Sequence, residues 1–278
     1  MNTKIRHPYV AGKFYPDSAI GIMDQIKNMR LSAISTINYN FADRKIYGAI
    51  LPHAGHIYSG YQTIHFFEIL QHSQQVFDTF IILHPIHRCV APEFAADASE
   101  KWMTPMGTVS LDLEFIAKSC LPVSTEQQKW EHSAEVILPF IQYFVNYNYK
   151  IVPIGISTQT LSIAMEISSC ISNAVYLTGR KICIIASSDF THYDTPENGR
   201  KMDQKVIDRI IEKDIEGIFY VIQQHNISVC GFGPIMTLVH YLNTIHKDLK
   251  ISVLNKGNSG DIHPSSTVVD YVSMLFHN

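Results

Sequence analysis

Residues 47–60 of the chain read Tyr47-Gly48-Ala49-Ile50-Leu51-Pro52-His53-Ala54-Gly55-His56-Ile57-Tyr58-Ser59-Gly60. The first five residues form a short, largely apolar run, which is typical of a buried β-strand. A loop with two histidines follows at once, and residues 62–71 beyond it have helical periodicity. This unit is a buried strand that delivers imidazole groups into the loop before a helix. We expect it to set the pattern for the rest of the chain.

The same order of strand, loop and helix recurs along the sequence. Further apolar runs predict strands at residues 79–83, 151–156, 182–186, 251–254 and 268–274. Segments with helical periodicity occupy residues 19–29, 135–147, 162–174, 202–213 and 234–244. This alternation predicts an α/β fold, a single-domain sandwich over residues 1–278 in which helices flank a central, mostly parallel or mixed sheet. In such folds ligands bind beyond the carboxyl ends of the strands.

The composition is that of an ordinary globular protein. Of the 278 residues, 46% are apolar and 17% are charged, and the formal net charge is −3, which argues against a broad basic face for nucleic acid. No apolar segment is long enough to span a membrane and no signal peptide is visible, so we expect a cytoplasmic protein. The five cysteines include no CxxC pair, which fits neither a disulfide framework nor a zinc ribbon.

Three of the predicted strands end beside histidines. Residues 47–51 precede His53, residues 79–83 precede the pair His84 and His87, and residues 182–186 precede a loop that contains His192. Because the carboxyl ends of parallel strands meet at one edge of a sheet, we expect these imidazoles to converge. Imidazole is a ligand of iron, copper and zinc. The sequence therefore predicts a metal site assembled from separate segments, with His53 and His87 as its first candidates.

Cys230 differs from the other cysteines. It lies in a glycine-flanked turn, Val229-Cys230-Gly231-Phe232-Gly233-Pro234, which runs into a predicted helix. A cysteine at a helix N-terminus tends to have a lowered pKa, which favours the thiolate as a nucleophile or a metal ligand. The remaining four occur in plain helix or strand patterns and are expected to be buried, inert thiols: Cys89, Cys120, Cys170 and Cys183.

Two further motifs supply acidic and basic groups. In residues 187–193, Asp189 could ligate a metal, orient a histidine or cap the next segment. His192 could act as a general base, because the unperturbed pKa of histidine is near ~6.5. In residues 131–135, Ser133 is predicted to cap a helix, and His132 and Glu135 are candidates to support a nearby site.

Together these motifs resemble the Memo family, also called the AmmeMemoRadiSam system protein B family. They are PHAGHIYSG at residues 52–60, HPIH at 84–87, EHSAE at 131–135, SSDFTHY at 187–193 and CGFGP at 230–234. They occur in the order and approximate spacing of that family. Residues 11–16, 104–107 and 259–261 resemble further family segments, so the likeness covers nearly the whole chain. The family is similar in fold to the class III extradiol dioxygenases.

The resemblance implies a transition metal, iron or copper with zinc as a further option, bound between His53, His87 and Cys230. In the related dioxygenases another histidine acts as acid and base, and His192 resembles it, with Asp189 beside it. The chain departs from the common pattern at His56, where an aromatic residue is usual, and at residues 84–86, where Gly-Pro-Ser is typical. His84 could thus replace or supplement His87, although strand phase and alignment favour His87.

Three functions remain open at this point. The first is a non-haem dioxygenase-like oxidoreductase with an unidentified small-molecule substrate, in which His192 shuttles a proton and Asp189 orients it. The second is a signalling module that binds phosphotyrosine peptides in the same cleft, where Arg88 could help to receive phosphate. The third is a metal-free hydrolase with Cys230 as nucleophile and His192 as base. The resemblance also implies a functional link to a radical-SAM protein and an A-type partner protein.

Overall fold

The computed structural model describes residues 4–88 and 91–278, and its middle layer is an eight-stranded mixed sheet. Seven strands follow one another in the spatial order β10-β11-β2-β8-β3-β7-β4, and β9 pairs with β11. The strands are β2 (Ile46–Leu51), β3 (Thr79–Pro85), β4 (Phe94–Ala96), β7 (Lys150–Ile156), β8 (Ile182–Ser187), β9 (His192–Asp194), β10 (Lys250–Asn258) and β11 (Val268–His277).

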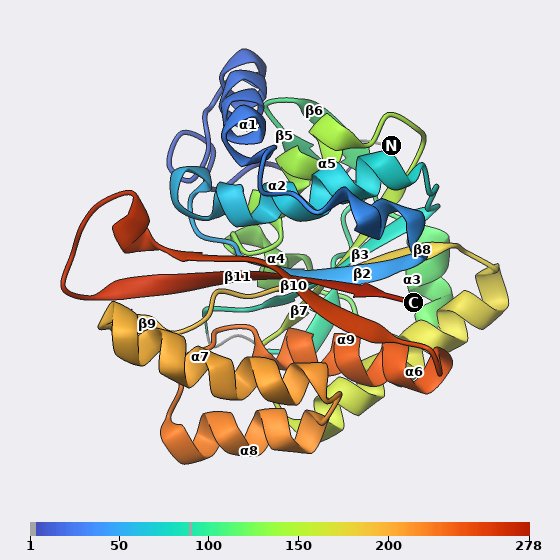
Figure 1. Ribbon diagram of the computed structural model, residues 1–278. Coiled ribbons are helices and arrows are strands. Elements are labelled where there is room, and N and C mark those ends of the chain that lie inside the picture. Colours follow the sequence, from blue (N-terminus) through green and yellow to red (C-terminus); the bar gives the residue numbers. More distant parts are fainter. Residues whose placement is uncertain (1–3, 89–90) are drawn as a thin grey trace.

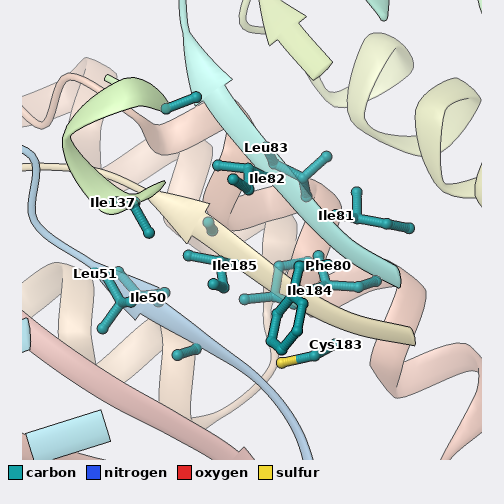
Figure 2. Close-up of a cluster of buried hydrophobic side chains, with 14 of the residues drawn as sticks. Ile50, Leu51, Phe80, Ile81, Ile82, Leu83, Ile137, Cys183, Ile184 and Ile185 are labelled. Atoms are coloured by element: carbon teal, nitrogen blue, oxygen red, sulfur yellow. The ribbon is translucent and has the colours of Figure 1, made fainter. Parts of the chain in front are cut away.

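The centre of the sheet is parallel and almost entirely buried. β8 pairs in parallel with β2 and β3, and β3 pairs in parallel with β7. Strands covered on both faces are expected to be apolar throughout. Their side chains form the cluster in Figure 2, where Ile50, Leu83 and Ile185 come from three neighbouring strands. The outer strands β4, β10 and β11 pair antiparallel, so the predicted α/β sandwich with a mixed sheet is confirmed.

Helices cover both faces of the sheet (Figure 1). On one side lie α1 (Ala19–Ala33), α2 (His56–Ser73) and α5 (Leu138–Phe144). On the other lie α6 (Leu161–Thr178), α7 (Pro196–Ile211), α8 (Ile215–His225) and α9 (Phe232–Ile245), and α3 (Leu113–Ser119) packs on α6. Among the described residues, no helix is both long and apolar enough to cross a bilayer.

A second, smaller sheet was not predicted from the sequence. Its three strands, in spatial order, are β1 (Ile5–Arg6), β5 (Lys101–Thr104) and β6 (Gly107–Ser110). The short helix α4 (Thr125–Lys129) and the 3₁₀ turns η1 (Tyr39–Asp43), η2 (Glu135–Ile137) and η3 (Ser259–Asp261) complete the fold. These elements are two to five residues long, too short to produce a recognisable hydrophobic period.

The helix expected over residues 135–147 is much shorter. Its first turn is the 3₁₀ segment η2, and α5 then runs only from Leu138 to Phe144. Pro139 stands in the first turn of α5, as expected, because this position needs no backbone N–H. The predicted cap at Ser133 is wrong. Ala134 precedes η2 without a side-chain cap, and the Ser133 hydroxyl donates instead to the carbonyl of Pro85.

Candidate metal centre

A cleft of about 350 Å³ opens beyond the carboxyl ends of the parallel strands β2 and β8 and the segment that follows β3. Its position is the one expected for ligand sites in sheets of this type. The residues that line it are Lys13, Phe14, His53, Ala54, Gly55, Tyr58, His87, His132, Asp189, His192, Tyr193, Val269 and Tyr271. Four of the thirteen are histidines, so the cleft is the place to look for metal ligands.

Three of these histidines form a compact group. One ring nitrogen of each of His53, His87 and His132 lies within 4.8 Å of the other two, which is close enough to share one ion. The ring centroids are 5.3 Å apart for His53 and His87 and 4.8 Å apart for His87 and His132. The structure thus brings the two histidines predicted as ligands together. It adds His132, which the sequence suggested only as a supporting residue.

Glu131 fixes the orientation of two of the three rings. Its Oε1 accepts hydrogen bonds from Nδ1 of His87 at 3.0 Å and interacts with Nδ1 of His132 at 3.2 Å. The same carboxylate accepts the backbone N–H groups of His87, His132 and Ser133. With Nδ1 engaged in this way, Nε2 is the nitrogen that carries the lone pair when each ring is neutral. A carboxylate behind a histidine is the usual support of a metal-ligating imidazole.

His53 is oriented by a chain of hydroxyl and carbonyl groups. The hydroxyl of Ser187 donates to the carbonyl of Ser133 at 2.7 Å, and this uses its only proton. Ser187 Oγ lies 2.7 Å from Nδ1 of His53 and can therefore only accept there, so Nδ1 carries the ring proton. Nε2 of His53 is left with its lone pair. All three rings thus present the same nitrogen as a potential ligand atom.

The surroundings set the protonation of the three rings. Burial holds the pKa of His53 well below its usual value and lowers the pKa of His132 to about 4. Burial also lowers the pKa of His87, but the hydrogen bond and charge of Glu131 outweigh it and raise the pKa overall. Two of the three imidazoles are therefore neutral at neutral pH, which is the form that binds metal.

Cys230 lies beside Nε2 of His53. Its Sγ is 3.2 Å from Nε2 of His53 and accepts the backbone N–H of Asp189 at 3.2 Å. Two ligands of one tetrahedral ion, at bond lengths of roughly 2.3 Å and 2.0 Å, would lie about 3.5 Å apart, so this spacing fits a shared ion. The group of three ligand atoms within 4.8 Å does not include Cys230.

The lowered pKa expected for Cys230 is wrong for the metal-free chain. Its Sγ is enclosed between His53 and Asp189. Desolvation by burial raises the pKa of the thiol well above its usual value, and the charge of Asp189 raises it further. Gly231 caps α9 without a side-chain bond, so Cys230 stands just before the helix rather than within its first turn, where the helix dipole acts most strongly.

Asp189 and His192 both line the cleft, but no hydrogen bond joins them in the described structure. Oδ1 of Asp189 accepts the backbone N–H of His53 at 2.8 Å, and burial raises the pKa of Asp189 to about 6. Nδ1 of His192 donates instead to the carbonyl of Ser228 at 2.7 Å. The predicted orienting role of Asp189 toward His192 is therefore taken by a backbone carbonyl. Nε2 of His192 keeps a free lone pair and suits a proton acceptor.

Three candidates from the sequence lie outside the cleft lining. His56 is fully buried at the start of α2, where its Nε2 donates to the carbonyl of Val136. His84 is buried in β3 with Nδ1 beside Ser133 Oγ, and it does not belong to the histidine group, whereas His87 does. The carboxylate of Glu135 accepts hydrogen bonds from Arg6, Tyr9, Val10 and Tyr15. It anchors the N-terminal segment, and its charge also acts on His132 by favouring the protonated form of that ring.

The other cysteines follow the expectation only in part. Cys183 is buried in β8 as predicted, and Cys170 is half-buried. Cys120 is exposed, because it ends α3 in a left-handed conformation with φ of 64°. Cys89 lies outside the described residues. In the described structure, the imidazole nearest to Cys230 is that of His53 rather than His192, so the pairing expected for a cysteine hydrolase is not formed.

Sequence reasoning missed the residues that hold the histidines in place. Glu131 is the first residue of the EHSAE segment and directly precedes His132, and this position was the available signal. Ser187 follows a predicted strand directly, as His53 nearly does. Neither residue type is distinctive by itself. Their roles arise from contacts between segments 44 to 134 positions apart in the chain.

Comparison with known proteins agrees with the sequence motifs and the fold. The sequence model described as "Memo-like protein" matches residues 6–275. The chain belongs to the Memo-like family. A MEMO1 family protein of Methanosarcina acetivorans is 34% identical over 276 residues, with 98% of this chain and 99% of the relative covered. MEMO1 family proteins of Archaeoglobus fulgidus and Saccharolobus solfataricus are 32% and 34% identical, each covering 98% of this chain and 99% of the relative.

A solved structure shows the same architecture at lower similarity. The crystal structure of the uncharacterized protein JW3007 from Escherichia coli K12 superposes with a TM-score of 0.50. Its sequence is 10% identical to that of this Memo-like chain. The superposition covers 75% of the Memo-like chain and 90% of the JW3007 chain. At this identity the likeness concerns the α/β fold alone. The cleft of the Memo-like chain is therefore interpreted from its own residues.

Proposed function

We propose that the chain binds a transition metal ion, iron or copper, in the cleft through His53, His87 and Cys230. One observation carries the proposal: three imidazoles converge and each presents Nε2, because Glu131 and Ser187 occupy the Nδ1 sides. A site preorganised in this way is typical of metal centres. The 3.2 Å spacing between Cys230 Sγ and His53 Nε2 supports the thiol as the third ligand. Two imidazoles and a thiolate suit copper, iron and zinc.

The chemistry that fits such a centre is redox chemistry on a small molecule. A bound iron or copper ion would supply electron transfer or activate a substrate. Residues of the chain would transfer protons and exclude water. Nε2 of His192 would accept or return a proton at the cleft wall, and the aromatic side chains of Phe14, Tyr58 and Tyr271 would exclude water from one side. We propose a dioxygenase-like oxidoreductase as the activity class, with a cytoplasmic location.

The experiment that tests metal binding uses the full chain purified under anaerobic conditions. Its metal content is measured directly and after loading with Fe(II), Cu(I) or Zn(II), beside the variants His53→Ala, His87→Ala and Cys230→Ser. We expect close to one ion per chain and its loss in all three variants. The matched control is His225→Ala, which removes an exposed histidine at the end of α8. Less than a tenth of an ion per wild-type chain after loading would contradict the proposal.

The third ligand needs a separate comparison. Loss of metal in Cys230→Ser with retention in His132→Ala supports the ligand set with the thiol. Retention of metal in Cys230→Ser with its loss in His132→Ala would identify His132 as the third ligand. The proposed metal centre would then have three imidazole ligands. A Co(II)-loaded sample adds a spectroscopic test, because a thiolate ligand gives an intense near-ultraviolet charge-transfer band that a site of three imidazoles lacks.

A second function for the same cleft is the binding of phosphotyrosine peptides in signalling. One observation favours it: Lys13 lines the cleft together with the histidines and could meet a phosphate. Arg88, which the sequence also suggested, donates to the hydroxyl of Tyr9 and does not belong to the lining. Titration of a phosphotyrosine peptide into wild type and Lys13→Ala separates the two functions. Peptide binding that a loaded metal ion abolishes would favour a shared site.

The family resemblance adds one proposal about partners. We propose a functional link to a radical-SAM protein and an A-type partner protein, with neither nucleic acid nor a membrane as a partner. Co-purification from a cell that encodes all three proteins tests it. Recovery of neither partner under native conditions would contradict a stable complex.

A further inference from the structure

Two carboxyl groups outside the cleft are buried against each other. Asp203 of α7 and Asp270 of β11 are 4% and 3% exposed. No N–H or hydroxyl donor among the described residues reaches Oδ2 of Asp270, and the carboxyl group of Asp203 is near enough to raise the pKa of Asp270 through its charge and a hydrogen bond. Two neighbouring ionised carboxylates repel each other, and they form a hydrogen bond only when one of them is protonated. A hydrogen bond between these two groups therefore requires one shared proton.

The backbone of α7 is shaped to permit this contact. A Cβ atom at Gly199 would lie 2.1 Å from Oδ2 of Asp270, far inside any real contact distance. Glycine at this position lets the helix approach β11 closely enough for the two carboxyl groups to meet. The pair is thus built by the packing of a helix on a strand and does not depend on a flexible surface loop.

The same two residues hold the loop that enters the cleft. Oδ1 of Asp203 accepts the backbone N–H of Thr191 at 3.0 Å and its hydroxyl at 2.6 Å. The backbone of Asp270 pairs with Phe190 and Thr191, through two hydrogen bonds of 2.9 Å. Thr191 lies directly before His192 and two residues after Asp189. Any change in the spacing of the two carboxyl groups is therefore passed to the segment that carries these cleft residues.

We propose that Asp203 and Asp270 share one proton and act as positioning residues for the loop of Asp189 and His192, so that the geometry of the cleft depends on that proton. This proposal rests on the proposed function in one respect only, which is that the cleft lined by the histidines is the functional site. Neither aspartate contacts His53, His87, His132 or Cys230 through a hydrogen bond in the described structure.

The charged neighbours agree with a single shared proton. Arg200 on α7 and Lys256 on β10 favour the ionised forms of Asp270 and Asp203 respectively, whereas Asp261 in η3 opposes ionisation of Asp270. Burial, followed by the charge of Asp203, raises the pKa of Asp270 to about 7. A cavity of about 300 Å³ beside the pair is lined by all five of these side chains, so water can deliver or remove the proton.

The pH dependence of this pair has a definite sign. A carboxyl group whose pKa is raised in the folded chain stabilises the folded state at low pH. That contribution is lost as the pH rises from the usual value of 3.8 toward about 7. Above this range both carboxyl groups are ionised, α7 and β11 repel each other at this point, and the hydrogen bonds from Thr191 to Asp203 are strained.

The experiment uses the metal-free full chain, so that it does not depend on metal binding. Asp270→Asn keeps the shape of the pair and replaces the shared proton by an amide that does not titrate. We expect its melting temperature to exceed that of wild type at pH 8, with the difference shrinking toward pH 4. Asp208→Asn is the matched control, because it changes an exposed aspartate on the same helix. Its melting temperature should follow wild type at every pH.

Hydrogen exchange of residues 189–192 tests the positioning role. After correction for the intrinsic pH dependence of exchange, we expect the wild-type segment to lose protection between pH 6 and pH 8, whereas Asp270→Asn keeps it. A purely structural pair would alter stability without this local, pH-dependent difference. Equal protection of both proteins at pH 8 overturns the proposal, and so do parallel melting curves across the pH range. Loss of metal binding in other experiments leaves both readouts unaffected.

Discussion

Glu131 Oε1 accepts a hydrogen bond from Nδ1 of His87 at 3.0 Å, and this contact decides which nitrogen of His87 is free for a ligand. The carboxylate is 97% buried and is held in place by three backbone N–H groups. It therefore cannot turn away from the ring without leaving its own partners unpaired. The proposed metal centre depends on this supporting contact as well as on the ligands themselves.

Replacing Glu131 tests that dependence. Glu131→Gln keeps the volume but removes the charge that accepts from His87 and His132, so we expect metal affinity to fall by about 10- to 100-fold. The measurement is a competition titration with Zn(II) and a chromophoric chelator. Glu126→Gln, on the exposed side of α4, serves as the control. An affinity in Glu131→Gln within about twofold of wild type would show that the rings hold their orientation without the carboxylate.

Ser187 has the corresponding role for His53. Ser187→Ala removes the acceptor of the Nδ1 proton, so the ring can exchange its tautomer and Nε2 no longer carries a fixed lone pair. We expect metal affinity to fall by about tenfold or more. Nitrogen-15 NMR of labelled histidine should report a mixture of tautomers for His53. Ser169→Ala, which removes a hydroxyl that bonds only within α6, is the comparison. A single Nδ1–H tautomer in Ser187→Ala would contradict the argument.

Glu135 is predicted to act on stability. Its carboxylate is fully buried and pairs with Arg6 at 2.6 Å. Glu135→Ala leaves the guanidinium buried without its partner, which costs about 3–5 kcal/mol. Urea unfolding of the metal-free chain measures this cost. Glu114→Ala breaks the exposed pair with Arg180 and should cost less than about 1 kcal/mol. A cost for Glu135→Ala that is equally small would refute the anchoring role.

His56 is predicted to make the fold sensitive to acid. Burial lowers its pKa from 6.5 to about 4, so the unfolded chain binds a proton more readily between these values. Stability therefore falls as the pH drops from 6.5 toward 4 and is constant above 6.5 as far as His56 is concerned. The full effect is roughly 3 kcal/mol. His56→Gln keeps a hydrogen-bond donor for the carbonyl of Val136. In this variant the free energy of unfolding should decline less steeply than in wild type as the pH falls from 6.5 to 4. An unchanged slope of the free energy against pH would assign the acid sensitivity to other groups.

Most of the fold was accessible from the sequence because each parallel strand contains a short apolar run. The runs around Ile50, Leu83 and Ile185 were recognisable, and the histidines directly beyond them pointed to the right edge of the sheet. The family motifs led to the same place. What the sequence could not supply is contact between segments. Glu131 and Ser187 matter only because the fold brings them to particular ring nitrogens.

The errors at the site share one physical cause, which is burial. A cysteine before a helix was expected to ionise readily, but the desolvation of Cys230 outweighs the helix terminus. His56 and His84 looked like neighbours of the ligands, yet both lie in the packed interior. Glu135, a candidate to support the site, anchors the N-terminal segment and acts on His132 through its charge. Adjacency in the sequence does not determine which side of a packed layer a side chain faces.

The strand order has a consequence for how the protein matures. β8, formed by residues 182–187, lies between β2 and β3, which precede it by about a hundred residues or more. Such long-range pairings form late, because the chain must lose the entropy of closing a large loop before the contacts between the strands can stabilise it. Cys230 emerges from the ribosome later still. A nascent chain therefore exposes His53 and His87 long before they can meet, and the assembled centre appears only when nearly the whole domain has been synthesised. The proposed metal ion would therefore bind after folding is complete, and it would stabilise only the finished protein.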